Sequence, residues 1–502
     1  MTVCACLWLG LFPLLQFGTY STITYNKWAI MLLMTCITLF SVISRKKKPE
    51  ETNLNPGKQA NKKRIATEKK KLPPPVMIAI ALTVWIVFSC LVSPYEPKVW
   101  FFGASSRLEG LLTQLCYLGL FFAFAHVQIR WKPVLVSAAV GVFVFFHVVM
   151  LQRAGLNPLG LYPKGRSFKT TQEFQGTIGN IDMDVGYLCL LAGLFTTEIF
   201  SFFSSLWQDI ILRFCFRRSS DQKKPSSSVP RSPLSGLITA ICAREEPLPP
   251  SRKILLCFRV ALHILYLLLL ISALAVTVFL IITMDVQFGL ITLAVLALIK
   301  LLRIIPRSWW KPVLLILLVL VLDVVWYWPG ESGGIWELKE ILYGRAQYSF
   351  GSNRLGVWIY SLMLAPERLL VGGGSDTFCL RFNSFLTRNG LKLPDHQGDV
   401  LLPNNFDNPH NEYIAHLINH GLPAMLLFAA LILAAVFWRR KTAAAGTDPP
   451  KQPVNFVRQL SPWAVGALCY AVQAFFSFSV CLVAPLFWVV LGISAGDNAM
   501  SE

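Results

Sequence analysis

Three histidines, three asparagines and two acidic residues gather in DNPHNEYIAHLINHGLPAM, residues 407–425, directly before a strongly apolar run. A histidine can take a proton from a hydroxyl group near neutral pH, so it can serve as a general base. We expect Asn408 to cap a helix and Pro409 to take its first position. On that helix His410 falls on the face opposite His416, which predicts an exposed histidine set apart at the helix start. The alternative interpretation is a cap-region histidine that only bonds to the backbone.

The other two histidines, His416 and His420, have the spacing of two zinc ligands on one helix turn. No HExxH glutamate and no evident third ligand accompany them in the sequence. We interpret them as histidines at the membrane interface, and we expect neither a metal nor another cofactor.

A second group of residues lies upstream, in GRAQYSFGSNRLGVWIYSLMLAPERLLVGGGSDTF, residues 344–378. Apolar residues recur at helical spacing after the SNR triplet, so Ser352 or Asn353 is the expected helix cap. Arg354 then lies in the first turn, where a cation is disfavoured and an anion held against the helix N-terminus would be its partner. The VGGGSDTF segment would offer free backbone N–H groups nearby. The alternative is a surface arginine followed by an ordinary glycine turn.

These residues belong to a chain of 502 residues that is 54% hydrophobic and 15% charged, with a mean hydropathy of +0.54. Such a composition excludes an ordinary soluble globular protein. Apolar runs of about 18 or more residues recur, and each can cross a hydrocarbon layer of roughly 30 Å as a helix. We expect an all-α polytopic membrane protein with about twelve transmembrane helices, at residues 3–20, 28–44, 76–93, 110–127, 133–151, 185–205, 258–283, 288–304, 313–328, 418–438, 460–476 and 478–495.

Basic residues orient these helices. Residues 45–75 hold eleven Lys/Arg against three Glu, and residues 207–253 hold nine against four acidic residues. Shorter basic turns occur at 128–132, 300–311 and 438–441. All five fall on one side if the helices alternate, and the positive-inside rule makes that side, with both termini, cytoplasmic. The net charge of +19 then reflects topology and contact with anionic lipid, and no nucleic-acid partner is expected.

The expected organisation follows from the spans and the long loops. The first span has no preceding Lys or Arg and no small-residue cleavage site, so we interpret it as an anchor. The predicted divisions are an N-terminal membrane hairpin (1–44), a basic cytoplasmic linker (45–75), membrane helices with outer loops 94–109 and 152–184 (76–205), a basic cytoplasmic loop (206–253), membrane helices (254–328), a large extracytoplasmic loop (329–409) and C-terminal membrane helices (410–502).

The large loop before the tenth span, residues 329–409, carries seven Lys/Arg and eight Asp/Glu together with aromatic residues and spaced glycines. This composition predicts a small structured cap rather than a charged tail. A patterned loop of that length is usually functional.

Taken together, these motifs resemble the O-antigen ligase and O-antigen polymerase-like superfamily of bacterial membrane glycosyltransferases. Members carry a large outer loop in which an Arg precedes a Trp and a Pro-x-x-x-x-Gly-type turn, and a His-Asn pair then precedes a Gly at a fixed distance. Here Arg354 and Trp358 precede PERLLVGGGSDTF, and nine residues separate the His410-Asn411 pair from Gly421.

Another part of the resemblance is GTIGNIDMDVGYLCLLAGL (176–194), which is similar to the family's Gly-x-x-Gly-Asn entry to a span. In all, the resemblance covers roughly residues 95–440. It implies a GT-C-like helical fold in the bacterial cytoplasmic membrane, with an active site on the outer face.

The implied activity is transfer of a glycan from a polyprenyl pyrophosphate, such as undecaprenyl pyrophosphate, to a hydroxyl group of a glycan, lipid or protein acceptor. The implied process is surface polysaccharide assembly, with polysaccharide-assembly proteins as further expected partners. Arginines and helix N-termini stabilise a pyrophosphate leaving group without a metal. His410 would be the general base, Arg354 the pyrophosphate clamp and Asn411 a support for the base or a sugar contact.

Two positions depart from the family pattern. Ala424 stands where the family often has a second glycine, which is a mild packing change. The segment TMDVQFGL (283–290) lacks the substrate-binding arginine that the family carries in a Ser-Arg-Gly element. The outer-face arginines that could replace it are Arg107, Arg166 and Arg345.

Other functions stay open from the sequence. A transporter or flippase of lipid-linked glycan would place ionisable groups at mid-membrane and carry broken helices or repeats. The sequence has few such groups and no evident repeat. An inactive family member, or a non-catalytic membrane scaffold, is a further alternative, and the motifs do not separate a ligase from a polymerase.

Overall fold

The computed structural model describes residues 1–45, 72–218, 250–394, 405–438 and 460–500, and every regular element among these residues is helical. The segments predicted as basic linkers lie largely outside the described residues. The helices that form the main bundle and its flank are α1 (Thr2–Cys6), α2 (Ile23–Arg45), α4 (Pro74–Leu91), α6 (Leu111–Ala125), α7 (Trp131–Arg153), α8 (Ile181–Arg218), α10 (Pro250–Met284), α11 (Gln287–Ile304), α12 (Trp310–Trp326), α17 (Leu422–Phe437), α18 (Pro462–Ala474) and α19 (Ala484–Met500).

Seven helical segments among the described residues are long and apolar enough to cross a membrane, by length and composition. They are Tyr20–Ser44, Pro74–Leu91, Trp131–Arg153, Ile181–Ser204, Cys257–Met284, Gln287–Ile304 and Arg307–Trp326. Four shorter apolar helical segments are Thr2–Leu14, Leu111–Ala125, Leu422–Phe437 and Ala484–Gly496. The prediction of an all-α polytopic membrane protein is confirmed, whereas the number of about twelve spans stays a prediction.

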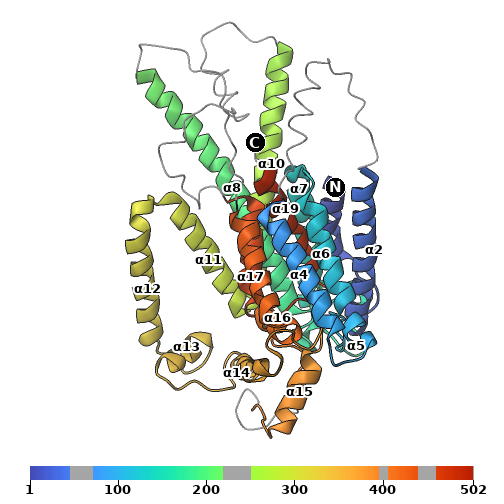
Figure 1. The fold of residues 1–502 in the computed structure, drawn as a ribbon. Coiled ribbons are helices and arrows are strands. Elements are labelled where there is room, and N and C mark those ends of the chain that lie inside the picture. Colours follow the sequence, from blue (N-terminus) through green and yellow to red (C-terminus); the bar gives the residue numbers. More distant parts are fainter. Residues whose placement is uncertain (46–71, 219–249, 395–404, 439–459, 501–502) are drawn as a thin grey trace.

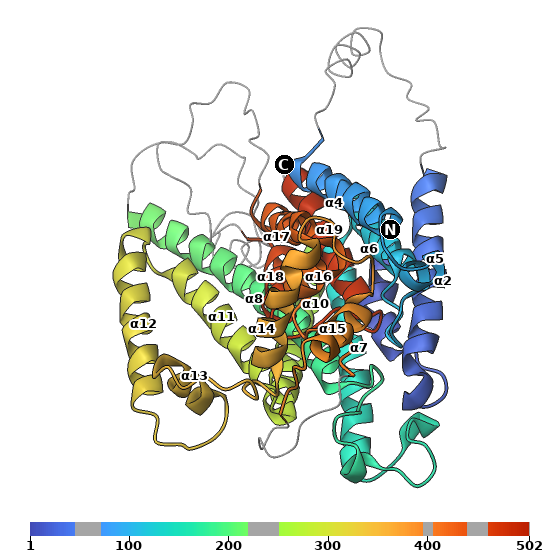
Figure 2. The ribbon, with the colours of Figure 1, turned by 60° about the horizontal axis from the view of Figure 1, so that its bottom comes forward.

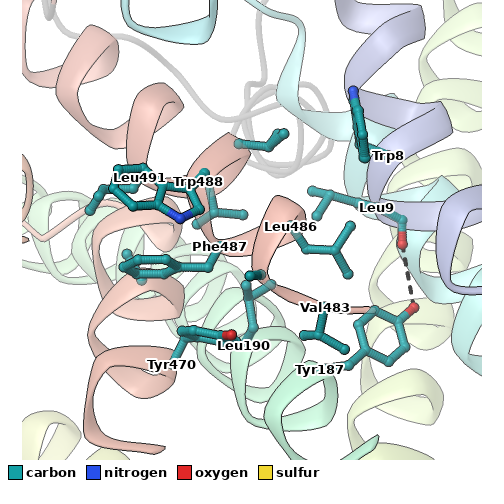
Figure 3. Packing of buried hydrophobic residues seen from close by; sticks show 14 of the residues in the cluster. Trp8, Leu9, Tyr187, Leu190, Tyr470, Val483, Leu486, Phe487, Trp488 and Leu491 are labelled. Atoms are coloured by element: carbon teal, nitrogen blue, oxygen red, sulfur yellow. Dashed lines mark hydrogen bonds between the residues drawn. The ribbon is translucent and has the colours of Figure 1, made fainter. Parts of the chain in front are cut away.

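The centre of the bundle is formed by helices that are far apart in the sequence. Helix α8 packs on α18 and α10, and α19 packs on α6. The backbones of α8 and α18 approach closely, because a Cβ added at Gly193 would lie 2.8 Å from the Cα of Gly466. Small residues at helix crossings allow this kind of packing in membranes. Figure 3 shows the buried side chains nearby, where the Tyr187 hydroxyl donates to the Leu9 carbonyl at 3.3 Å.

The first expected span, residues 3–20, is not one regular helix. Helix α1 continues into a π-helical turn, Leu7–Leu11, and then into a short 3-10 helix, Phe12–Leu14. The helical segment ends at Leu14, and the last carbonyls of a helix need donors from elsewhere. The fully buried Lys27 ammonium supplies them, since it donates to the carbonyls of Phe12 and Pro13 at 2.9 Å each.

One end of the bundle carries a group of short helices, shown at the bottom of Figure 1. They are α5 (Pro97–Phe102), α13 (Gly334–Leu342), α14 (Arg354–Leu364), α15 (Phe378–Arg388) and α16 (Glu412–His420). Helices α2, α8 and α17 end, and α4 and α10 begin, at the opposite end of the bundle (Figure 1). The chain therefore leaves for its predicted basic segments from the end opposite these short helices.

The segment predicted as a structured cap does fold. Helices α14, α15 and α16 enclose a hydrophobic core of their own, separate from that of the bundle, and Figure 2 shows them in front of it. This second core consists of Val357, Tyr360, Leu364, Ala365, Phe378, Phe382, Phe385, Leu386, Leu393, Leu417 and Ile418. The short helices of the cap are thus stabilised by packing against one another, which isolated helices of this length need.

The helix expected near residues 418–438 is interrupted close to its start. The chain breaks at Gly421, where φ is +84° and ψ is 173°, and separates α16 from α17. This backbone conformation is accessible almost only to glycine. Residues before Gly421 therefore belong to the cap, and the apolar helix begins at Leu422.

Candidate functional site

His410 lies in the last turn before α16 rather than inside the helix. Asn411 is the N-cap, and its side-chain oxygen accepts the Ile414 N–H at 3.0 Å. Asn408 instead accepts the N–H of His410 at 3.0 Å and forms a tight turn. The predicted helix start at Asn408 and Pro409 is therefore wrong. His410 has φ of +48°, an uncommon conformation for a residue with a side chain.

The His410 side chain is half-buried, so it is less accessible than the exposed histidine that the sequence predicted. Its ring stands edge-on to Phe478, with 4.8 Å between the centroids, and its Nδ1 atom is buried without a hydrogen-bond partner. Burial, together with the charges of Arg354 and Arg107 and against the opposing charge of Asp407, lowers the pKa of His410 to about 4. At neutral pH the imidazole is therefore neutral and can accept a proton.

Arg354 begins α14, as predicted, and its partner is a carboxylate. Nη2 donates to Oδ2 of Asp182, at the start of α8, at 3.1 Å, and the guanidinium lies 6.0 Å from the Phe288 ring centroid. An arginine side chain has five N–H donors, so this contact leaves others for an anion. The side chain is 22% exposed, which keeps those donors accessible.

Trp358 connects the arginine helix to the histidine. It lies one turn after Arg354 on α14, and its Nε1 donates to the carbonyl of Pro409 at 2.8 Å. Its ring packs against Phe475 and Phe476. Residues four apart on a helix share a face. Arg354 and Trp358 therefore lie on the same face of α14, the face that binds the backbone next to His410.

Of the three arginines considered as replacements, only Arg107 reaches this site. Its Nε donates to Oδ2 of Asp407 at 2.8 Å, and its guanidinium lies 5.0 Å from the centroid of the Phe478 ring. Phe478 thus contacts both Arg107 and His410.

The other two proposed arginines are placed elsewhere. Arg345 is 62% exposed and is bound by Glu340 of α13, at 2.6 and 2.8 Å. Arg166 is exposed in the loop before α8. Within the described part of the chain neither side chain contacts the residues around His410, so the structure does not bring these two predicted substrate-binding residues to the site.

The segment that lacks the family arginine, residues 283–290, lies between arginines from other elements. Arg153, at the end of α7, donates from Nη1 to the Thr283 hydroxyl at 2.8 Å, and Phe288 lies beside Arg354. No sequence motif indicated a functional role for Arg153 or Asp182. The available signal for Asp182 was an acidic residue in the first turn of a helix, within the quoted motif at 176–194.

The three glycine N–H groups of the VGGGSDTF segment are not free, which corrects that expectation. The N–H of Gly373 donates to Ile418 at 3.2 Å, and that of Gly374 donates to Asn419 at 2.7 Å. These carbonyls are the last of α16 and need external donors. The glycine turn therefore caps α16 and fixes its end against the loop.

His416 and His420 are both buried within the protein, at 3% and 2% exposure. His420 is paired through Nε2 with the Ser375 hydroxyl at 2.9 Å, and the His416 ring packs on Phe428 at 4.4 Å. Among the described residues, no group of three or more His, Cys, Asp or Glu side chains could hold a metal ion.

A pocket of ≈ 40 Å³ opens beside His410, between the cap and the bundle. It is lined by Arg107, Glu109, Gln114, Asp376, Phe378, Asp407, Asn408, Pro409, Glu412, Ala415, His416, Asn419, His420, Phe478 and Ser479.

The fold and this site define a polytopic membrane protein that holds a neutral imidazole near two arginines at one end of its bundle. Such an arrangement suits an anionic group and a hydroxyl group that loses a proton. Residues 269–429 match the family model described as O-antigen ligase. The matched region runs from the second half of α10 into α17 and contains Arg354, Trp358 and His410.

This match confirms the predicted resemblance to the O-antigen ligase-like superfamily. It supports an integral membrane enzyme of surface polysaccharide assembly. No curated protein matches the chain.

Proposed function

We propose that the protein transfers a glycan from a polyprenyl-pyrophosphate carrier to an acceptor hydroxyl group. The observation that carries this proposal is the environment of His410, a neutral imidazole with an unpartnered Nδ1 and the charges of Arg354 and Arg107 close by. A base beside cations is what attack by a hydroxyl on a sugar phosphate requires.

In the proposed reaction His410 takes the proton of the acceptor hydroxyl while its oxygen forms a bond to the anomeric carbon. The bond between that carbon and the pyrophosphate oxygen breaks, and the electron pair leaves with the pyrophosphate. Arg354 stabilises the leaving anion with the donors that Asp182 does not use. The histidine then releases its proton to solvent, so no metal or other cofactor is needed in this scheme.

Binding of the donor also tunes the base. The positive charge of Arg354 contributes to the low pKa of His410. An anion beside Arg354 offsets that charge, so the pKa of His410 rises when the pyrophosphate binds. The histidine becomes a stronger base when a donor is present.

Asn411 supports the base rather than touching the sugar in this proposal. Its side chain is 2% exposed and is occupied in capping α16. It fixes the chain direction directly after His410 and thereby positions the imidazole.

The proposed location is the bacterial cytoplasmic membrane, with both termini cytoplasmic and His410 on the outer face. The support for this orientation is that the basic segments leave the bundle at the end opposite the cap. The lipid of the donor would lie in the bilayer, and a glycan, lipid or protein acceptor would approach from outside together with any polysaccharide-assembly partner.

The test uses the purified full-length protein in lipid nanodiscs, a synthetic polyprenyl-pyrophosphate glycan and a pool of acceptors. Release of polyprenyl pyrophosphate is measured for the wild type, His410→Asn and Arg354→Ala. Matched controls are His147→Asn and Arg388→Ala, because His147 is an exposed helix residue and Arg388 is an exposed arginine of α15 bound by Glu367.

We expect release by the wild type and both controls, and loss of release in the two site variants. Release that survives in His410→Asn would overturn the assignment of the base. No release by the wild type, with tight lipid binding unaffected by either site variant, would favour transport or an inactive family member.

A further inference from the structure

Most of the residues that line the pocket beside His410 have polar side chains. Eleven of its fifteen lining residues carry hydrogen-bonding side chains. Its walls come from five separate parts of the chain: the start of α6 with the segment before it, the start of α15, the turn before α16, one face of α16, and the loop before α19. A site assembled from so many elements is fixed by the fold as a whole.

Several polar atoms around the pocket have no hydrogen-bond partner. His416 lacks one at both ring nitrogens, His420 at Nδ1 and Asn419 at Oδ1. Glu412 accepts the Ser479 N–H at 2.6 Å, while its other oxygen is 3.6 Å from Nε2 of His416. Buried polar groups are nearly always paired, so a cluster of unpaired ones beside a pocket indicates a ligand that pairs them.

Four acidic residues line the pocket against one arginine, Arg107, so the lining disfavours the pyrophosphate as that ligand. The carboxyl groups of Glu109, Asp376 and Glu412 face it, and burial raises the pKa of Asp376 to about 6 and that of Glu109 well above its usual value. Burial lowers the pKa of His416 to about 4, so its imidazole is neutral. Protonated or not, these groups suit an uncharged ligand that both donates and accepts hydrogen bonds, as a hydroxyl group does.

The size of the pocket limits the ligand further. One water-sized group needs about 10–15 Å³ by this measure, so ≈ 40 Å³ holds about three of them. A whole sugar ring does not fit, but one edge of a ring with two or three hydroxyl groups does. Phe378 and Phe478 add apolar surface for the carbon-bound hydrogens of the ring.

We propose that this pocket is a sugar-edge subsite, in which Glu412, His416 and Asn419 bind the hydroxyl groups along one edge of the sugar ring next to the reacting bond. The inference rests on the proposed function and deepens it, because it names the elements that select the sugar. The ring is either the first sugar of the donor or the terminal sugar of the acceptor. Phe478 touches the His410 ring and lines the pocket, so either ring would lie directly beside the base.

The test compares His416→Phe and Asn419→Leu with the control Asn389→Leu, which changes an exposed asparagine of the same cap. In the donor arm, binding of polyprenyl-pyrophosphate glucose, galactose and N-acetylglucosamine to the full-length protein is measured against polyprenyl pyrophosphate without sugar. In the acceptor arm, the methyl glycosides of the same sugars are tested for binding in the presence of sugar-free polyprenyl pyrophosphate. Thermal unfolding checks the fold, and Asn419→Asp, which keeps the shape, replaces any variant that unfolds.

We expect the wild type and Asn389→Leu to discriminate among the sugars in one of the two arms, and that arm identifies the source of the ring. The pocket variants should lose at least tenfold of this discrimination while binding sugar-free polyprenyl pyrophosphate as the wild type does. Equal discrimination by wild type and pocket variants, or none by the wild type in either arm, would overturn the subsite. Selective binding that depends on the pocket, without any glycan transfer, would instead contradict the proposed function and leave the subsite standing.

Discussion

The ion pair between Arg354 and Asp182, 3.1 Å from Nη2 to Oδ2, joins the cap to the membrane bundle. Arg354 begins α14 of the cap, and Asp182 lies in the first turn of α8, outside the region that matches the O-antigen ligase family. The arginine proposed to hold the pyrophosphate is thus positioned by a residue from the other half of the chain.

Replacing Asp182 with Asn should weaken catalysis by misplacing Arg354. The two side chains are 22% and 17% exposed, and a hydrogen bond between charged groups contributes about 1.5–3 kcal/mol, or roughly ten- to hundredfold in kcat/KM. Steady-state kinetics with varied donor measures the effect. Asp182→Glu should recover part of it, and Asp323→Asn on α12 serves as the control. Unchanged kinetics in Asp182→Asn would show that the ion pair does not position the arginine.

Replacing His410 with Asn should remove the base without unfolding the protein. Asparagine tolerates the positive φ of +48° better than most residues, so the turn before α16 is kept. We expect kcat to fall by about 10²–10⁴-fold, the usual contribution of a general base. The thermal unfolding midpoint should stay close to that of the wild type. A folded variant with wild-type kcat would contradict the role of His410.

The pH dependence of the reaction should differ between free enzyme and complex. A base acts in its unprotonated form, and the pKa of His410 is about 4 without substrate, so the acid limb of kcat/KM should lie near that pH. Bound pyrophosphate offsets the charge of Arg354 and raises this pKa, so the acid limb of kcat should lie at higher pH. Kinetics in nanodiscs from about pH 3 to about pH 8 cover both sides of a limb near pH 4 and measure both limbs. Coincident limbs would argue against coupling of Arg354 to the base.

Replacing Trp358 with Phe should loosen the site while keeping the packing. The change removes the 2.8 Å hydrogen bond to the Pro409 carbonyl, whereas an aromatic ring still faces Phe475 and Phe476. A hydrogen bond of this kind contributes about 1 kcal/mol, so we expect a several-fold loss of kcat. Trp309→Phe, at an exposed position, is the control. If both variants are equally active, the link between α14 and His410 is not needed for catalysis.

The features that the sequence predicted correctly depend on local signals. The start of α14 follows from the SNR triplet and the apolar spacing after it, and the apolar lengths define the long helices. The start of α16 was mispredicted because Asn408 and Asn411 are both good caps. In the structure Asn411 is the cap. The turn before it contacts Trp358 and Phe478, which lie far away in the sequence.

The three outer-face arginines also could not be told apart by local sequence signals. Arg107, Arg166 and Arg345 are equivalent by charge and by predicted side of the membrane, and only the fold separates them. Arg107 meets Asp407 across 300 residues of chain, and Arg345 is held by its neighbour Glu340. The glycine turn was also misjudged for a non-local reason, because the carbonyls that occupy its N–H groups belong to α16.

Gly421 should be the position of the site least tolerant of a side chain. Besides its φ of +84°, a Cβ there would overlap the backbone carbonyl of Leu370 and lie 2.8 Å from the N atom of Val371. Backbone strain of this kind costs about 1–3 kcal/mol, and the overlap with main-chain atoms adds to it. Gly421→Ala should therefore lower the thermal unfolding midpoint and the yield of folded protein, and should displace the end of α16 from the glycine turn that caps it.

The matched control for Gly421→Ala lies three residues further on, at Ala424. Ala424→Gly restores the residue that the family often has there, inside α17, where glycine costs only about 1 kcal/mol relative to alanine. We expect this variant to unfold close to the wild-type midpoint and to keep its activity. If Gly421→Ala were as stable and active as Ala424→Gly, the break at Gly421 would not be what holds α16, and with it His410, in place.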